Sequence, residues 1–495
     1  MAKDMSKRKH KAPVSRRIKV NEAYMKEHLG IGVSFDLGFR KLTLLKKDVY
    51  IYYLTGLTET PIIVELLEQL VRINDDERQS QKLDDIIQNR LVHQQVNAVD
   101  TMDEAVDQLL SGLIVVFIDG FTKGYVIDVR SYPGRTPEEP DTERVIRGSR
   151  DGYTENVVIN TALTRRRIRD ERLRNEMLKV GERSKTDVCV AYLQDVADKG
   201  LIDLVKSKIN EIEIDGISMA EKSLEEFIVK RGIIPYPMVR FTERPDVAAT
   251  HLLEGHVVIL VDTSPSAIIV PATFFHHMQH AEEFHQSPVI GTVIRWLRFC
   301  AVLMSIFLLP LWLLFVMDPT LLPKALSFIG PNEEGNIPIS IQIIMGMAGI
   351  EFLRMAAIHT PTPLSTAMGL IAAVLIGQIA IDVGMFSPEV ILYVSLSAIG
   401  GYVTPSYELS VANKLANVFL VIVTALFGLK GFLIGVLVYT LWLVRLSALN
   451  TPYLWPFIPF NFKAMMQIII RVPVPFSNKR PSIVHPENNY RQPVK

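Results

Sequence analysis

The stretch FCAVLMSIFLLPLWLLFVM, from Phe299 to Met317, decides the architecture of this 495-residue chain. Its nineteen residues carry no charge. A helix rises about 1.5 Å per residue, so roughly twenty such residues cross a hydrocarbon core about 30 Å thick. Further long apolar segments follow as far as Leu449, and none precedes Gly291. The sequence therefore predicts a large water-facing region followed by a transmembrane helical domain over residues 289–450.

The number of membrane spans depends on how the shorter apolar segments are counted. After 299–317, the candidates are 337–353, 365–386, 388–403, 411–428 and 431–449. Arg295 and Arg298 precede the first span, and the tail 451–495 is also rich in Lys and Arg. By the positive-inside rule both flanks are cytoplasmic, which requires an even number of crossings. We expect six spans, or four if 337–353 does not cross and two short segments form a re-entrant pair.

Composition excludes several classes of protein. The 53 basic and 53 acidic residues balance, which excludes a strongly basic nucleic-acid-binding protein. Residues 1–20 are basic and lack the apolar core of a secretion signal, so we expect a cytoplasmic tail. The two cysteines, Cys189 and Cys300, are too few for a disulfide framework. The chain shows no phosphate-binding glycine loop, nucleophile elbow or zinc-ligand spacing, and we expect no enzyme activity, metal or cofactor.

The water-facing region contains a duplication. Asp103–Asp119 reads DEAVDQLLSGLIVVFID, and Asp246–Asp262 reads DVAATHLLEGHVVILVD. Each copy predicts a short helix, a glycine with a left-handed backbone (Gly112 or Gly255), and a buried strand that ends at an aspartate. Two related α/β modules are therefore expected, over residues 21–154 and 155–288. Because an aspartate after a strand usually serves a turn, we assign neither Asp119 nor Asp262 to catalysis.

The second module contains one further pattern. TDVCVAYLQ, a helix near 200–211 and EIEIDGI predict a strand, a helix and a second strand in succession.

The region that joins the modules, residues 128–170, is the most distinctive polar stretch of the chain. Thr154 is expected to cap a helix that carries a cluster of arginines. Acidic residues upstream can fold back onto these arginines, which predicts a charged network at a module or subunit interface; a solvated run of charge is the alternative. The candidate interface residues are Arg144, Arg147, Asp151, Glu155, Arg165, Arg166, Arg167 and Arg169.

Two motifs point to a known family. EPDTERVIRGSRDGYTENVVINTALTRRRIRD, and GTVIRWLRF leading into LLPLWLL, resemble the GerA family of spore-germination receptor A-subunits from about residue 30 to 475. The chain departs from the receptor pattern after Glu351, where receptors typically continue with an acidic residue and an Arg-Leu-Pro turn, and where this chain reads FLRM and then IHTPTP. This departure argues against assigning nutrient-receptor behaviour to this chain directly from the resemblance. The resemblance implies a homo-oligomer in the inner membrane of the spore that acts with other germination membrane proteins and conducts ions.

Polar side chains within the apolar segments are candidates for an ion path, because ionisable groups are costly inside a bilayer. Ser410, Asn413 and Asn417 form a stripe at helical spacing, and Gln378 and Asp382 lie one turn apart. The candidate path residues are Glu351, Gln378, Asp382, Asn413 and Asn417. A ring of such carboxylates from several subunits favours monovalent cations, so we expect a cation channel.

A second set of residues is assigned to gating or packing: Arg354, Glu408, Lys414, Pro361 and Pro363. Arg354 shares a helix face with Glu351, and the two can simply pair. Helix-end charges can extend to lipid headgroups, and Asn and Ser stripes can merely pack helices together. The alternative function is therefore a non-conducting scaffold or receptor subunit that clusters germination proteins.

Overall fold

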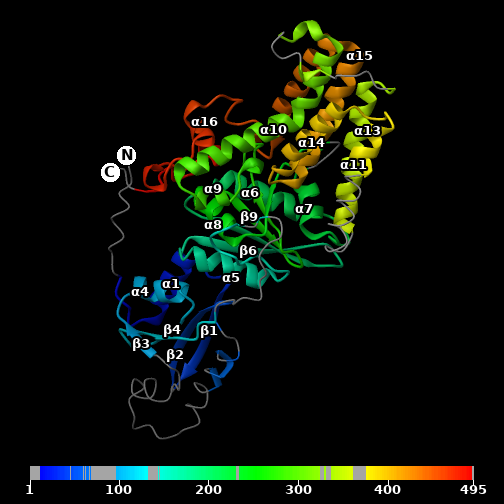
Figure 1. Ribbon diagram of the computed structural model, residues 1–495. Helices are drawn as coiled ribbons and strands as arrows, with labels where there is room; N and C mark the ends of the chain where they lie inside the picture. Colours follow the sequence, from blue (N-terminus) through cyan, green and yellow to red (C-terminus); the bar gives the residue numbers. More distant parts are fainter. Residues whose placement is uncertain are drawn as a thin grey trace. The chain divides into compact units, whose positions relative to one another are not determined.

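The computed structural model describes residues 12–44, 46–58, 61, 63–65, 67–68, 96–131, 143, 145–229, 234–323, 328–330, 336–359 and 375–492. The chain forms two compact units (Figure 1). The α/β unit comprises Met1–Gly232, Val239–Pro271 and Pro473–Lys495. The helical unit comprises Ile233–Met238 and Ala272–Val472.

The first sheet of the α/β unit is antiparallel throughout, with the strand order β1-β2-β4-β5-β3. Every residue of β4, which reads IVVFI, is buried, so both faces of the sheet are covered there. Helices α1 and α4 pack against one face through Met25, Leu29 and Leu109. The elements are α1 (Ile18–Leu29), β1 (Leu37–Leu44), β2 (Lys47–Leu54), β3 (Val96–Val99), α4 (Met102–Leu110), β4 (Ile114–Ile118) and β5 (Gly124–Ile127).

The second sheet repeats this topology, with the strand order β6-β7-β9-β10-β8. Gly112 and Gly255 follow α4 and α8, and their φ angles of 94° and 105° are left-handed as predicted. The duplication expected from the sequence is confirmed. The elements are α5 (Val157–Arg167), β6 (Leu173–Val180), β7 (Thr186–Leu193), α6 (Lys199–Asn210), α7 (Ala220–Val229), β8 (Arg240–Thr242), α8 (Pro245–Glu254), β9 (Val257–Val261) and β10 (Ala267–Val270).

The paired aspartates cap helices that lie far away in the sequence. Asp119 Oδ1 accepts a hydrogen bond from the backbone N–H of Ile18, the first residue of α1, at 3.1 Å. Asp262 Oδ1 accepts one from Val157, the first residue of α5, at 3.0 Å. A carboxylate at a helix N-terminus satisfies an unpaired donor and complements the helix dipole. These aspartates are therefore structural, and they repeat because the module repeats.

Two local predictions for the second module are wrong. EIEIDGI, residues 211–217, is a loop rather than a strand, so no β-α-β unit forms and every described pairing of this sheet is antiparallel. Helix α5 is capped by Asn156, whose side chain accepts hydrogen bonds from the N–H groups of Val158 and Ile159. Thr154 instead accepts a hydrogen bond from the N–H of Asn156 and so supports the cap from outside the helix.

The helical unit is built on α10, which packs along α14 and α15 (Figure 1). Its apolar core includes Leu309 and Trp312 from α10, Ile343 from α11, Val394 from α14 and Val421 from α15. The elements are α9 (Glu282–His285), α10 (Pro288–Met317), α11 (Ile339–His359), the π-helical turn η4 (Leu375–Ile379), α13 (Ala380–Asp382), α14 (Pro388–Tyr402), α15 (Tyr407–Arg445), β11 (Ser447–Ala448), β12 (Thr451–Pro452) and α16 (Phe462–Ile469). Short 3-10 turns also occur in both units: η1 (His276–Met278), η2 (Pro319–Leu321), η5 (Val474–Phe476) and η6 (Ser482–Val484).

Helix α15 reverses direction at Gly428, where φ is 57° and ψ is −138°. A methyl group at Gly431 would clash with the carbonyl oxygen of Val423, and one at Gly435 would lie 3.1 Å from Leu420 Cδ2. Residues on either side of Gly428 therefore face each other, and α15 is an antiparallel helical hairpin. The spacing of Gly431 and Gly435 permits this close approach.

Among the described residues, three helices are long and apolar enough to cross a membrane: α10, the part Ile339–Ala357 of α11, and α15. At about 1.5 Å per residue the two halves of α15, 407–427 and 429–445, are roughly 30 and 25 Å long. The first predicted span lies in α10, and the segments 411–428 and 431–449 correspond to the two halves of α15. Most of the predicted span 365–386 lies outside the described residues.

Candidate functional site

A set of buried polar side chains lies where α10, α14 and α15 meet, and we call it the polar seam. Asn417 Nδ2 on α15 donates to the carbonyl oxygen of Ser305 on α10 at 2.7 Å, and Ser397 Oγ on α14 donates to the same oxygen at 3.5 Å. Ser410 Oγ donates to the carbonyl oxygen of Gly401 at 2.9 Å. The polar seam comprises Ser305, Ser397, Ser410, Asn413, Asn417 and Thr424, each at most 7% exposed.

Several atoms of the seam lack protein partners. Asn413 Nδ2, Asn417 Oδ1 and Thr424 Oγ1 have no hydrogen-bond partner within the described part of the chain. These residues are fully buried, and a buried polar group left unpaired costs about 1–3 kcal/mol. Asn413 and Thr424 are eleven residues apart on one helix face, which spans about 16 Å at the helical rise. The seam is therefore long, buried and incompletely satisfied.

One end of the seam is joined to Tyr236, a residue that the sequence analysis did not single out. The Tyr236 hydroxyl donates to Asn413 Oδ1 at 3.1 Å and lies 2.7 Å from the hydroxyl of Tyr439. Its ring is enclosed by the aromatic rings of Phe274, Tyr439, Trp442 and Tyr453. Tyr236 belongs to the helical unit, although the residues before Ile233 and after Met238 belong to the α/β unit.

The predicted path residue Glu351 lies in an ion cluster. Glu351 Oε1 accepts a hydrogen bond from Arg354 one turn along α11, and Oε2 accepts one from Lys414 of α15 at 2.5 Å. The cations also lie over tyrosine rings, Arg354 over Tyr407 and Lys414 over Tyr402. Both carboxylate oxygens are therefore engaged, and one negative charge faces two positive charges. The simple pairing of Glu351 with Arg354, left open by the sequence, occurs in this structure.

The remaining candidates of the helical unit are placed as follows. Gln378 lies on η4 and Asp382 on α13, and both side chains are exposed. Neither residue belongs to α10, α14 or α15, the helices that form the polar seam. Glu408 lies in the first turn of α15. Pro361 and Pro363 lie outside the described residues, directly after α11 ends at His359.

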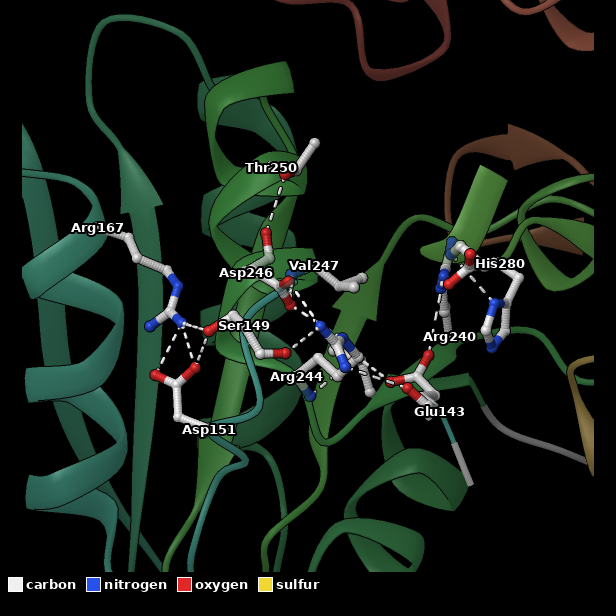
Figure 2. Close-up of polar contacts among 12 residues, drawn as sticks. Glu143, Ser149, Asp151, Arg167, Arg240, Arg244, Asp246, Val247, Thr250 and His280 are labelled. Atoms are coloured by element: carbon white, nitrogen blue, oxygen red, sulfur yellow. Dashed lines mark hydrogen bonds and ion pairs between the residues drawn. The ribbon is translucent and has the colours of Figure 1, made fainter. Parts of the chain in front are cut away.

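We call the charged region that joins the two modules the charged joint. Its described residues form a network of ion pairs and hydrogen bonds (Figure 2). Arg167 donates to both carboxylate oxygens of Asp151, at 2.6 and 2.7 Å, and to Ser149 Oγ at 2.7 Å. Burial alone would raise the pKa of Asp151, but the hydrogen bonds from Arg167 and Ser149 outweigh it and lower the pKa below its ordinary value. The fold-back of acidic residues onto the arginines is therefore present at this position.

Arg244, which the sequence analysis did not select, completes this network. It is fully buried and donates to both oxygens of Asp246, at 3.1 and 2.8 Å. It also donates to the carbonyl oxygens of Glu143 and Ser149, at 3.2 and 2.8 Å, which fastens the joint to the start of α8 (Figure 2).

Arg165 has a different role from its neighbours. Its guanidinium donates to Asp36 at 2.9 and 3.3 Å, and both side chains are buried. Asn175 Nδ2 donates to the same carboxylate at 3.0 Å. Asp36 precedes β1 of the first sheet, whereas α5 and β6 carry Arg165 and Asn175, so this cluster ties the two modules together. Among the arginines predicted at an interface, Arg165 therefore makes a buried contact between the modules.

The remaining predicted interface residues are placed as follows. Arg169 Nη1 lies 3.5 Å from Ser111 Oγ, an exposed and distant hydrogen bond. Arg147, Glu155 and Arg166 lie among the described residues of the joint and of α5, and Arg144 lies outside the described residues.

The sequence of the chain matches a family model over residues 23–483, that of the Bacillus/Clostridium GerA spore germination protein. The chain belongs to this GerA family.

Two relatives illustrate the match. Stage V sporulation protein AF of Bacillus subtilis (strain 168) is 57% identical over 487 residues, which cover 98% of this chain and 99% of that protein. Spore germination protein KA of the same organism is 28% identical over 93% of this chain and 86% of that protein. The crystal structure of the N-terminal domain of the A subunit of the Bacillus megaterium spore germinant receptor GerK3 covers 53% of this chain and 98% of that chain, with 25% identity and a TM-score of 0.42. This GerA-family chain is accordingly a spore germination or sporulation membrane protein.

Sequence reasoning on the GerA-family chain missed several members of the seam, for identifiable reasons. Thr424 lies seven residues after Asn417, so extending the polar stripe by two helical turns would have found it. Ser305 and Ser397 are single small polar residues in apolar runs, and nothing local shows that they face each other. Tyr236 lies in an apolar, proline-flanked segment that carries no recognisable motif.

Proposed function

We propose that this GerA-family protein is a subunit of an oligomeric channel for monovalent cations that promotes or amplifies spore germination. In this proposal it has no enzyme activity, both termini are cytoplasmic, and it acts in the spore inner membrane with other germination membrane proteins. The relatives are named for sporulation and germination, which supports the proposed role in spores. The conducting role rests on the polar seam.

The observation that carries the proposal is the set of unpaired buried atoms at Asn413, Asn417 and Thr424. Lipid offers no hydrogen bonds, so a polar group kept inside a membrane helix bundle needs a protein partner or water. Nearby carbonyl and hydroxyl oxygens at Ser305 and Ser410 add ligands of the kind that replace the hydration shell of a cation. A file of amide, hydroxyl and carbonyl groups about 16 Å long is therefore suited to water and to a hydrated monovalent cation.

Tyr236 supports a means of control within this proposal. Its hydroxyl donates a hydrogen bond to Asn413 Oδ1. The chain on both sides of its segment belongs to the α/β unit. A rearrangement of the α/β unit would therefore act on Asn413 through a connection of a few residues. In this proposal Tyr236 closes the seam at rest and leaves Asn413 when germination is signalled.

Asn417→Leu tests the proposal in full-length protein that also carries Tyr236→Phe, which in this proposal opens the seam, reconstituted into vesicles loaded with a potassium-sensitive dye. Leucine has the same branched arrangement of heavy atoms but cannot bind water, so we expect cation flux to fall to background while the protein remains folded. Thr440→Leu, made in the same background, is the matched control, because Thr440 is exposed on the second half of α15 and its hydroxyl donates to the carbonyl oxygen of Val436 one turn earlier. Flux through Asn417→Leu equal to that through Thr440→Leu would remove the seam from the proposal.

A specific observation favours the alternative, a non-conducting scaffold. Both carboxylate oxygens of Glu351 are held by Arg354 and Lys414, so this side chain offers no free carboxylate to a passing cation here. A scaffold would show no flux in vesicles for the Tyr236→Phe protein or for either leucine variant made in it. Germination of spores that carry Asn417→Leu would then equal that of the parent.

A further inference from the structure

The chain carries an exposed apolar surface next to the point where α10 begins its charge-free stretch. On the first turns of α10, Val293, Trp296 and Leu297 are exposed, the last two at 50% and 64%. After the α15 hairpin, Phe460, Phe462 and Ile470 are also exposed, and the two phenylalanines are 66% and 63% accessible. We call these six residues the apolar platform. Large apolar side chains gathered in this way mark a surface that binds a partner.

The two halves of the platform are fastened together. Arg295 Nη1 on α10 donates to the carbonyl oxygens of Gln467 and Ile468 at the end of α16, at 2.9 and 2.8 Å. Trp296 Nε1 donates to the carbonyl oxygen of Ile469 at 3.0 Å. These bonds satisfy carbonyl groups that a helix leaves unpaired at its C-terminus, and they hold α16 against the first turns of α10.

Beneath the apolar platform lie a buried ion cluster at Glu283 and a close backbone contact at Gly291. Glu283 is fully buried and accepts hydrogen bonds from Arg295, at 2.8 Å, and from Arg298. A methyl group at Gly291 would lie 2.6 Å from the carbonyl oxygen of Glu283 and 2.8 Å from Arg471 Cδ. The orientation of α16 along α10 is therefore well determined by the bonds and packing beneath it.

The level of the platform relative to a bilayer follows from helix geometry. The charge-free stretch begins at Phe299, and Val293 and Leu297 precede it by six and two residues. At about 1.5 Å per residue, these side chains lie roughly 3–9 Å outside the hydrocarbon core, which is the depth of the headgroup region. Ile469, bonded to Trp296, lies at the same depth.

The positive charge of the segment that carries α16 is complementary to an anionic membrane surface. Residues 452–472 contain Lys463 and Arg471 and no acidic residue. Lys463 is exposed and lies beside Phe462. A short apolar segment with exposed aromatic side chains, basic residues and no acidic residue is typical of segments that lie in the plane of an anionic membrane surface.

We infer that the apolar platform is seated in the headgroup layer of an anionic membrane leaflet, with α16 lying in the membrane plane beside the entry of α10. The surface thus binds lipid rather than a second copy of the chain. Residues 452–472, which follow the last span, are in this respect a membrane-bound element. This inference does not depend on whether the protein conducts ions.

The test uses full-length protein with Cys300→Ser, a single new cysteine and an environment-sensitive fluorophore; the remaining Cys189 is buried. Phe462→Cys places the label on the platform, and Met219→Cys places it on an exposed apolar residue of the α/β unit as the matched control. The vesicles contain phosphatidylcholine with about 30% phosphatidylglycerol, because anionic lipid supplies the surface potential. Some lipids carry a spin label, either near the headgroup or deep in the chain.

We expect the shallow spin label to quench the fluorophore at residue 462 about threefold more strongly than the fluorophore at residue 219. At residue 462, the shallow spin label should also quench more strongly than the deep one. Adding Lys463→Glu should weaken the shallow quenching in anionic vesicles and leave it unchanged in pure phosphatidylcholine. Equal quenching at residues 462 and 219 would overturn the inference. So would efficient 462-to-462 cross-linking between two copies, because the platform would then be a protein interface.

Discussion

Two buried polar clusters lie about two turns apart along α10 and differ in how completely their polar atoms are paired. In the first, Glu283 binds Arg295 and Arg298, and both guanidiniums also donate to backbone carbonyl groups. In the second, the polar seam, Asn413 and Asn417 each retain a polar atom without a partner within the described residues. The first cluster carries formal charge, and the second carries none.

The difference indicates which cluster is structural. Burying ions is tolerable only when each is matched by an opposite charge and further hydrogen bonds, and the Glu283 cluster meets that condition. Amides cost less to bury than ions, so a bundle can keep a few of them incompletely paired where water or an ion is to pass. We therefore expect changes at Glu283 to affect stability most, and changes at the seam to affect conduction most.

The largest expected effect on stability is at Glu283. Glu283→Gln would leave two buried guanidiniums without a counter-charge, and we expect a loss of about 3–5 kcal/mol in the free energy of unfolding. Thermal unfolding of the detergent-solubilised protein measures it, with Glu282→Gln, at the neighbouring partly exposed position, as the control. Equal melting temperatures for the two variants would show that the buried charges do not stabilise the unit.

A smaller effect on stability, with a larger one on conduction, is expected at Tyr236. Tyr236→Phe keeps the ring within its aromatic enclosure but removes the hydroxyl bonds to Asn413 and Tyr439. We expect a loss of about 1–2 kcal/mol, because each bond is worth about 1 kcal/mol. Vesicle flux should rise in the absence of any germination signal. Tyr393→Phe, on α14 against Trp312, is the control for removing a tyrosine hydroxyl elsewhere. A resting flux that stays at the parent level would separate Tyr236 from control of the seam.

A smaller effect on stability than at Tyr236 is expected at the ion cluster on α11. Glu351→Gln, Lys414→Gln and the double variant form a thermodynamic cycle, for which we expect a coupling of about 0.5–1 kcal/mol, because Glu351 is only partly buried. Zero coupling would show that the pair does not stabilise the helical unit. If Glu351 acts in conduction only after release from its partners, Lys414→Gln should raise cation flux and Glu351→Gln should lower it.

Asp382 is expected to show the smallest effect on stability. Its side chain is exposed on α13, so Asp382→Asn should change the free energy of unfolding by less than about 0.5 kcal/mol. In an oligomeric channel with Asp382 at the lumen, the variant should nevertheless lower the preference for potassium over chloride, measured by reversal potential. An unchanged preference would remove Asp382 from the path and leave the seam as the selective element.

Much of the fold could be predicted because its signals are local in the sequence. The spacing of 143 residues between two similar stretches predicted the repeated modules, and the left-handed glycines at Gly112 and Gly255 followed from their place after a helix. The capping roles of Asp119 and Asp262 could not be predicted, because each binds a helix more than 100 residues away. EIEIDGI was predicted as a strand from its alternation, yet in the structure no neighbouring strand pairs with it.

For the candidate site, the sequence by itself determined which polar residues lie in apolar helices, since composition and helical period are properties of the chain alone. It thus identified Asn413, Asn417 and Glu351 as costly residues in their segments. The tertiary structure alone decided their partners: Glu351 is paired with cations, whereas Asn413 meets Tyr236 from a distant segment. The physical reason is that the cost of a buried polar atom depends on what lies within hydrogen-bonding distance of it, and only the packing of distant segments sets those neighbours.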